Sequence, residues 1–258
     1  MLFRSAGLAA RGLQRGDCLA IWMNNSPLWV ALLFACARLG VTVMAANTRF
    51  RSAEIGDILA RSGARALVLA PQFRNIDYLA MLDGVERACV KDLRFVIGVG
   101  EEAELPREVC GLNVVPASTL PLADRTVPEA GGADDGCVMF TTSGTTSKPK
   151  LVLHLQRSIV AHVYDTAHAL GYDAPGSVIE VVTPLCGVSG FGMPITAMAA
   201  GAPCVLSSAL DVSQLYDSIE KNGVSHIHAN HEIIRRLLDA MDGKKGLSSL
   251  KAINCGSG

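Results

Sequence analysis

Short, continuous runs of apolar residues alternate along this chain with segments whose apolar residues recur at helical spacing. The runs contain little polar alternation and are rich in Leu or β-branched residues, which is typical of parallel strands buried on both faces. Nine of them predict strands: 18–23, 41–45, 66–69, 95–99, 137–141, 178–182, 203–207, 224–228 and 250–254.

The segments between these runs predict helices. One follows Ser26 and extends to 39, a second extends over 52–62, and others are marked by apolar residues over 159–170, 211–219 and 233–238. This alternation predicts an α/β fold with doubly wound, mostly parallel sheets flanked by helices. We expect two lobes, 1–116 and 136–258, because Pro, Gly and acidic residues gather in a surface connection over 117–135.

Composition narrows the functional classes. The 258 residues are 50% hydrophobic and 18% charged with a net charge of −1, which excludes a disordered chain and a phosphate-driven nucleic-acid binder. The long apolar stretch 29–46 is interrupted at Arg38 and Gly40, and 181–210 contains three prolines, so neither provides about 20 uninterrupted membrane-spanning residues. We expect no membrane span, no nucleic-acid partner and a cytoplasmic location. The eight scattered cysteines form no C-x-x-C pair and predict neither a disulfide framework nor a metal site.

One segment carries candidate chemistry. Between 141 and 150, six hydroxyl side chains surround a glycine and are accompanied by two lysines. Backbone N–H groups freed by the glycine, hydroxyl donors and two ammonium groups suit a polyphosphate. A solvated Ser/Thr turn is the alternative, but the preceding strand, the helical pattern predicted after the loop and both lysines favour phosphate binding. The spacing is not that of a Walker A loop.

This segment resembles the phosphate-binding signature T-S-G-T-T-G-x-P-K-G of the adenylate-forming superfamily, which includes acyl-CoA synthetases, 4-coumarate–CoA ligases, luciferases and peptide-synthetase adenylation domains. Ser147 and Leu151 replace two of its glycines. Segments 12–27, 40–51 and 183–191 also resemble family motifs, as do 224–230 and 250–258, so the resemblance covers nearly the whole chain.

The resemblance implies three groups of binding residues. The ATP phosphates would be held by Thr142, Ser143, Gly144, Thr145, Thr146, Ser147, Lys148 and Lys150. The acyl pocket would include Cys186, Gly187, Phe191, His228, Asn230 and His231. The adenine would contact Gly256, Ser257 and Gly258. A tight strand-to-helix turn is the alternative for the glycine-rich part of 187–192, and both interpretations are compatible. Cys186-Gly187 replaces an aromatic–His pair of the family, which suggests a larger or differently shaped acid.

The resemblance also implies a function. A carboxylate would attack the α-phosphate of ATP in the presence of Mg²⁺, and the thiol of CoA would then displace AMP from the acyl-adenylate. The family's Mg²⁺-binding Glu, ribose-binding Asp and catalytic Lys match no position here and are expected downstream of Gly258. We therefore expect a truncated N-terminal domain without its C-terminal lid domain and catalytic residues, inactive alone. An adenylation domain loading a carrier protein and a non-catalytic nucleotide- or acyl-binding remnant are the alternatives, and a homodimer is left open.

Overall fold

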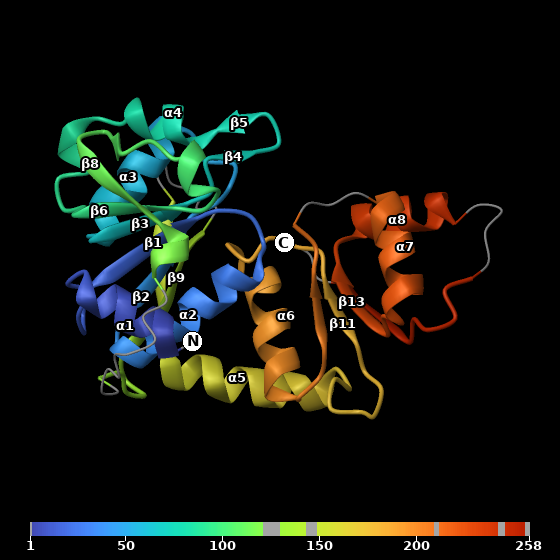
Figure 1. The fold of residues 1–258 in the computed structure, drawn as a ribbon. Coiled ribbons are helices and arrows are strands. Elements are labelled where there is room, and N and C mark those ends of the chain that lie inside the picture. Colours follow the sequence, from blue (N-terminus) through green and yellow to red (C-terminus); the bar gives the residue numbers. More distant parts are fainter. Residues whose placement is uncertain (1, 121–129, 143–148, 209–211, 242–245, 256–258) are drawn as a thin grey trace. The chain divides into compact units, whose positions relative to one another are not determined.

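The computed structural model describes residues 2–120, 130–142, 149–208, 212–241 and 246–255. The chain forms two compact units (Figure 1). Unit 1 comprises Met1–Asn24 and Leu28–Ile159, and unit 2 comprises Asn25–Pro27 and Val160–Gly258. Each unit contains its own sheet.

Unit 1 is built on an eight-stranded sheet of order β10-β9-β2-β1-β3-β6-β8-β7. Its six inner strands are parallel, and an antiparallel strand lies at each edge. The strands are β1 (Cys18–Trp22), β2 (Thr42–Ala45), β3 (Ala66–Leu69), β6 (Phe95–Gly98), β7 (Glu108–Val109), β8 (Leu112–Pro116), β9 (Gly136–Thr142) and β10 (Lys150–Leu155). The remaining elements are helices α1 (Leu2–Ala10), α2 (Pro27–Leu39), α3 (Ser52–Ser62) and α4 (Tyr78–Asp83), the short hairpin β4 (Gln72–Phe73) and β5 (Ile76–Asp77), and three 3₁₀ turns (Arg87–Cys89, Glu102–Glu104 and Ala117–Thr119).

The central strands of unit 1 are buried along their whole length. Every residue of β1 is buried, although successive side chains point to opposite faces of the sheet. On one face Trp22 stacks on Tyr78 with ring centroids 4.3 Å apart, and the Tyr78 hydroxyl donates to the carbonyl of Thr48. Burial on both faces explains why these strands lack apolar–polar alternation in the sequence.

The division between the units differs from the predicted one. We expected a connection between lobes at 117–135, but β9 pairs in parallel with β2, with Val43 opposite Val138 and Met44 opposite Met139. This pairing brings 136–142 into the sheet of unit 1, and the chain passes to unit 2 between Ile159 and Val160. The Pro- and Gly-rich segment therefore connects two parts of one sheet.

Unit 2 has a four-stranded, entirely parallel sheet of order β12-β11-β13-β14. The strands are β11 (Ile179–Val181), β12 (Cys204–Leu206), β13 (His226–Ala229) and β14 (Ala252–Cys255). Helix α5 (Gln156–Ala169) leads into the unit, and α6 (Val188–Ala199), α7 (Val212–Asn222) and α8 (His231–Ala240) connect its strands. The two sheets confirm the predicted α/β class, and all nine predicted strands are present, each within two residues of its expected ends.

The two faces of this second sheet differ in character. Ile227 and Ala229 of β13 pack with α7 and α8 in an apolar cluster that includes Ile219 and Leu237. Helix α6 covers the opposite face (Figure 1). Tyr172 and His226 also lie there, and the Tyr172 hydroxyl donates to Met193 Sδ at 3.1 Å. Burial raises the pKa of Tyr172 to about 12. Around β13, the α7/α8 face is therefore apolar, whereas the other combines aromatic, imidazole and hydroxyl groups.

Further findings concern membranes, metals and thiols. Within the described ranges, no helix has the length and apolar character that crossing a bilayer requires. No group of three or more His, Cys, Asp and Glu side chains among the same residues could hold a metal ion. All eight cysteines are free thiols.

A buried carboxylate lies in β11. Glu180 has no exposed surface, and its two oxygens accept hydrogen bonds from Ser207 Oγ at 2.7 Å and Ser218 Oγ at 2.9 Å. Burial raises the pKa of Glu180, and burial together with the nearby Glu180 carboxylate raises the pKa of Cys204 to about 12. The two hydroxyl groups therefore compensate only part of the cost of removing this charge from water.

This burial predicts a signed pH dependence of stability. Because the folded pKa of Glu180 is raised, the folded state binds its proton more tightly, so this group's contribution to stability decreases as pH rises above about 4.5. We expect Glu180→Gln to become more stable relative to wild type as pH increases from 5 to 8, measured by thermal unfolding. Glu220→Gln, an exposed change in α7, is the control. A pH-independent difference for Glu180→Gln would contradict the prediction.

Candidate functional site

The strand order of unit 2 reverses between β11 and β13. The connection through α6 leads from β11 to β12 on one side, and the connection through α7 then leads to β13 on the other side of β11. In open parallel sheets, ligands bind outside the carboxyl ends of the strands at such a reversal. The carboxyl ends of β11 and β13 are therefore the candidate site.

The turn after β11 contains two of the predicted acyl-pocket residues. Cys186 is buried, and Gly187 is exposed at the N-cap of α6. One helical turn later, Phe191 is buried, and its N–H donates to the carbonyl of Gly187 at 2.9 Å. Residues Cys186, Gly187 and Phe191 thus lie together where β11 passes into α6. The structure is compatible with both interpretations of segment 187–192, as a tight strand-to-helix turn and as a wall of the acyl pocket.

His228 lies near the carboxyl end of β13, in register with Val181 of β11 and Asn254 of β14. Its ring is half-buried, and burial lowers its pKa, which favours the neutral imidazole. Its Nδ1 is inaccessible to solvent and has no hydrogen-bond partner among the described residues. Buried polar atoms are normally paired, so this atom is a candidate for a hydrogen bond with a polar ligand.

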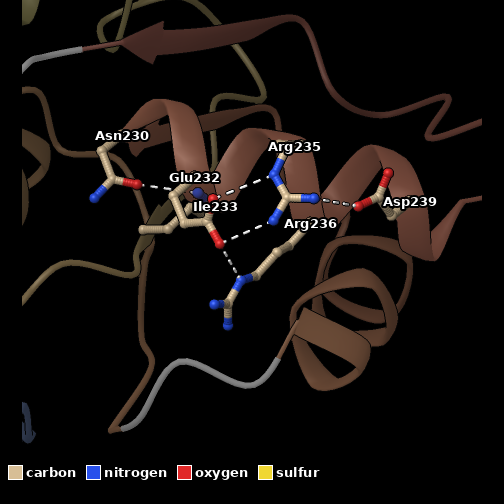
Figure 2. A network of polar contacts seen from close by, with 6 residues as sticks. All are labelled: Asn230, Glu232, Ile233, Arg235, Arg236 and Asp239. Atoms are coloured by element: carbon tan, nitrogen blue, oxygen red, sulfur yellow. Dashed lines mark hydrogen bonds and ion pairs between the residues drawn. The ribbon is translucent and has the colours of Figure 1, made fainter.

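Asn230 and His231 follow β13 but have different environments. Asn230 is the N-cap of α8, and its Oδ1 accepts from the Ile233 N–H at 3.0 Å (Figure 2). His231 is the first residue of the helix and is exposed. Helix capping therefore accounts for the Oδ1 atom of Asn230. The contact of Asn230 with an acid stays a prediction.

The first turns of α8 are held by a surface ion-pair network (Figure 2). Glu232 binds both Arg235 and Arg236, and Arg235 also binds Asp239 at 3.0 Å. Hydrogen bonds from the two arginines hold the pKa of Glu232 at about 2. All these charged side chains pair with one another within α8, so we assign the network to the stability of this helix.

The predicted phosphate-binding segment belongs to unit 1. Thr142 ends β9 and Lys150 begins β10, and these two exposed residues are paired across the antiparallel hairpin. The intervening residues Ser143, Gly144, Thr145, Thr146, Ser147 and Lys148 lie outside the described residues. The helix predicted over 159–170 is present as α5 (Gln156–Ala169), but β10 was not predicted and lies between the loop and this helix, because Leu151–Leu155 pairs with β9. The β-prone run Leu-Val-Leu could have predicted this strand.

The predicted adenine-binding residues Gly256, Ser257 and Gly258 also lie outside the described residues. They follow β14 directly, because this strand ends at Cys255. Because the sheet is parallel, Cys255 lies at the same carboxyl edge as the end of β11 and the end of β13.

Two further residues contact this edge. Asn25 was not predicted from the sequence as a component of the site, whereas Gly190 is one of the glycines of 187–192 that were expected to form a turn or a wall of the acyl pocket. The side chain of Asn25 forms hydrogen bonds with backbone groups of Thr183, Leu185 and Ser207. Gly190 in α6 lies so close to the turn that an added Cβ would be 2.0 Å from the carbonyl oxygen of Pro184. No periodic pattern in the sequence predicts either contact, because each contact joins segments that are separated by loops.

Comparisons with known proteins point to one family. The family described as "AMP-binding enzyme" matches residues 4–258. The chain is 28% identical to a 3-[(3aS,4S,7aS)-7a-methyl-1,5-dioxo-octahydro-1H-inden-4-yl]propanoyl:CoA ligase of Mycobacterium tuberculosis, over 96% of this chain and 48% of that protein. It is 27% identical to 4-coumarate–CoA ligase 5 of Oryza sativa subsp. japonica, over 98% of this chain and 45% of the relative. The chain thus spans about half the length of the curated relatives it matches.

Solved structures share the fold. An o-succinylbenzoate CoA synthetase from Bacillus subtilis, in complex with its acyl-adenylate intermediate, superposes with a TM-score of 0.78 at 22% identity, covering 100% of this chain and 60% of that one. Mycobacterium smegmatis MbtA superposes with a TM-score of 0.81 at 22% identity, covering 99% of this chain and 45% of that one.

The close approach of Gly190 predicts a stability difference between two glycines of α6. Gly190→Ala would drive a methyl group into the Pro184 carbonyl and should destabilise the protein by about 1–3 kcal/mol. Gly192→Ala is the matched control, because nothing lies within 4 Å of its added Cβ, and it should stabilise the helix by up to about 1 kcal/mol. Chemical denaturation measures both, and equal effects would contradict the assignment.

The capping role of Asn230 predicts a second difference. Asn230→Ala removes the acceptor for the Ile233 N–H and should destabilise the protein by about 1 kcal/mol. Asn230→Asp keeps an oxygen at the cap and should retain most of the stability. Denaturation midpoints of the two variants test this, and an equal loss in both would show that the cap contributes nothing.

Proposed function

Because the chain belongs to the AMP-binding enzyme family, we propose that the protein activates a carboxylic acid with ATP and transfers the acyl group to CoA. One observation supports this proposal most strongly. The predicted acid-binding residues lie near or after the ends of two adjacent strands, β11 and β13, at the edge of the sheet where the strand order reverses. The names of the two sequence relatives support the same reaction, because both are named CoA ligases.

The proposed reaction has two steps. A carboxylate oxygen of the acid attacks the α-phosphorus of ATP, and the bond to the bridging oxygen breaks with release of pyrophosphate. The sulfur of CoA then attacks the acyl carbon, the bond to AMP breaks, and the thiol proton is released. The substrate carboxylate is itself the nucleophile, so this reaction requires no Ser–His–Asp arrangement from the protein.

The two described phosphate-loop residues suit this chemistry. Thr142 provides a hydroxyl and Lys150 an ammonium group at the two ends of the β9–β10 hairpin, and both are exposed. An ammonium group close to a polyphosphate compensates its charge and stabilises negative charge that develops as pyrophosphate leaves. The described residues contain no carboxylate cluster suited to Mg²⁺, so we derive no step through the metal.

The acid would lie at the edge of unit 2. Buried Cys186 and Phe191 provide apolar contact, exposed Gly187 leaves space, and His228 provides an imidazole whose lowered pKa keeps it neutral. A neutral wall with one available polar atom favours an acid with a large apolar body that carries a polar group. We place the reaction in the cytoplasm, the reducing compartment that suits eight free thiols.

Calorimetric titration of the 258-residue chain tests the proposal. We expect separate binding of ATP and of a non-hydrolysable acyl-AMP analogue. Removing a charge-assisted contact costs about 1.5–3 kcal/mol, so Lys150→Ala should weaken ATP binding at least about tenfold. Lys221→Ala, a surface change at the end of α7, is the control and should leave the Kd for ATP unchanged.

The outcomes separate the alternatives. Binding of both ligands, with loss of ATP affinity in Lys150→Ala alone, supports acid activation. Binding of the acyl portion without ATP would indicate a non-catalytic acyl-binding protein. Binding of neither ligand by the folded chain would contradict the proposal.

A further inference from the structure

The side chain of Asn25 uses its hydrogen-bonding groups on the backbone at the carboxyl ends of two strands. Its Nδ2 donates to the carbonyl of Thr183 at 2.9 Å and to that of Ser207 at 3.1 Å, and its Oδ1 accepts from the Leu185 N–H at 2.8 Å. Thr183 and Leu185 belong to the turn after β11, and Ser207 directly follows β12. The residue is only 6% exposed, so these bonds are shielded from competing water.

Asn25 reaches these strands from a distant part of the sequence. The segment Asn25–Pro27 belongs to unit 2 although it follows β1 and ends at the first residue of α2. More than 150 residues separate Asn25 from each of its partners. An amide is the side chain that fits, because two donors and one acceptor are needed at one point. Asp would keep the acceptor but would present a carboxylate to two carbonyl oxygens.

The strand ends that Asn25 joins are also fixed by other contacts. Ser207 Oγ donates to the buried Glu180, whose second oxygen is bound by Ser218 of α7. On the turn after β11, Gly190 packs against the Pro184 carbonyl, and the Gly187 N–H donates to the same carbonyl at 3.1 Å. Asn25 is the link between the Glu180–Ser207 pair and this turn.

We propose that Asn25 is a positioning residue that sets the place of the turn 183–187 and thereby the size of acid that fits beside Cys186 and Gly187. This inference rests on the proposed function, because the turn is assigned there to the acid. The amide acts through the backbone and touches neither the acid nor ATP. Its loss should therefore change selectivity among acids and leave ATP binding intact.

Hydrogen exchange on the ligand-free chain tests the structural half of the inference. In Asn25→Ala and Asn25→Asp, we expect amide exchange in 183–187 to accelerate at least tenfold, whereas β13 keeps its protection. Asn113→Ala, an exposed change in β8, should alter neither segment. Unchanged protection of 183–187 in both Asn25 variants, or equal loss of protection throughout unit 2, would overturn the inference.

Binding tests the functional half in the same variants. A series of acyl-AMP analogues of increasing acyl size is titrated, with ATP as the reference ligand. We expect the ratio of affinities for small and large acyl groups to change at least fivefold, with the Kd for ATP within twofold of wild type. Faster exchange without a change in this affinity ratio would show that Asn25 only stabilises the turn, and it would overturn the proposed positioning role. If wild type itself binds none of the analogues, the proposed function fails and this role fails with it, whatever the exchange data show.

Discussion

Parallel pairing is the constraint on which this structure depends. Neighbouring parallel strands need a crossover that covers one face of the sheet, so the sheet is buried and each strand delivers its carboxyl end to the same edge. In unit 2, all four strands obey this rule, and the reversal of order between β11 and β13 separates the loops that follow them. The candidate site is therefore a consequence of the topology before any side chain is considered.

The polar interior of unit 2 follows from the same arrangement. An apolar cluster of α7, α8 and β13 provides the burial that stabilises one face, and this face also contains Glu180 with its two serine donors. The other face combines Tyr172, His226 and His228. Burial of a carboxylate that two hydroxyl groups compensate only in part lowers stability, and its hydrogen bond with Ser207 ties the carboxyl end of β12 to β11.

Much of this fold could be predicted from the sequence. Nine apolar runs predicted nine strands because strands buried on both faces must be continuously apolar. Helix α6 was not predicted, because two glycines and Pro194 break the usual pattern, although burial in the structure compensates their low helical propensity. The two-residue strands β4 and β5, which pair only with each other, were also missed, as were β7, β8 and β10 of the first sheet. They lie at or near sheet edges, where partial exposure weakens the apolar signal.

The site was predictable to a similar extent. Short motifs indicated the β9–β10 hairpin, the turn with Cys186 and the end of β13, because loops that bind ligands require particular residue types at adjacent positions. By itself, the sequence determined the α/β class and the family, and it predicted the segments that we propose to carry the chemistry, since these depend on local composition and spacing. Only the tertiary structure decided that 136–142 completes the first sheet, that Asn230 caps a helix, and that Asn25 binds the turn after β11. Each depends on hydrogen bonds whose partners are chosen by proximity in space, which no local pattern records.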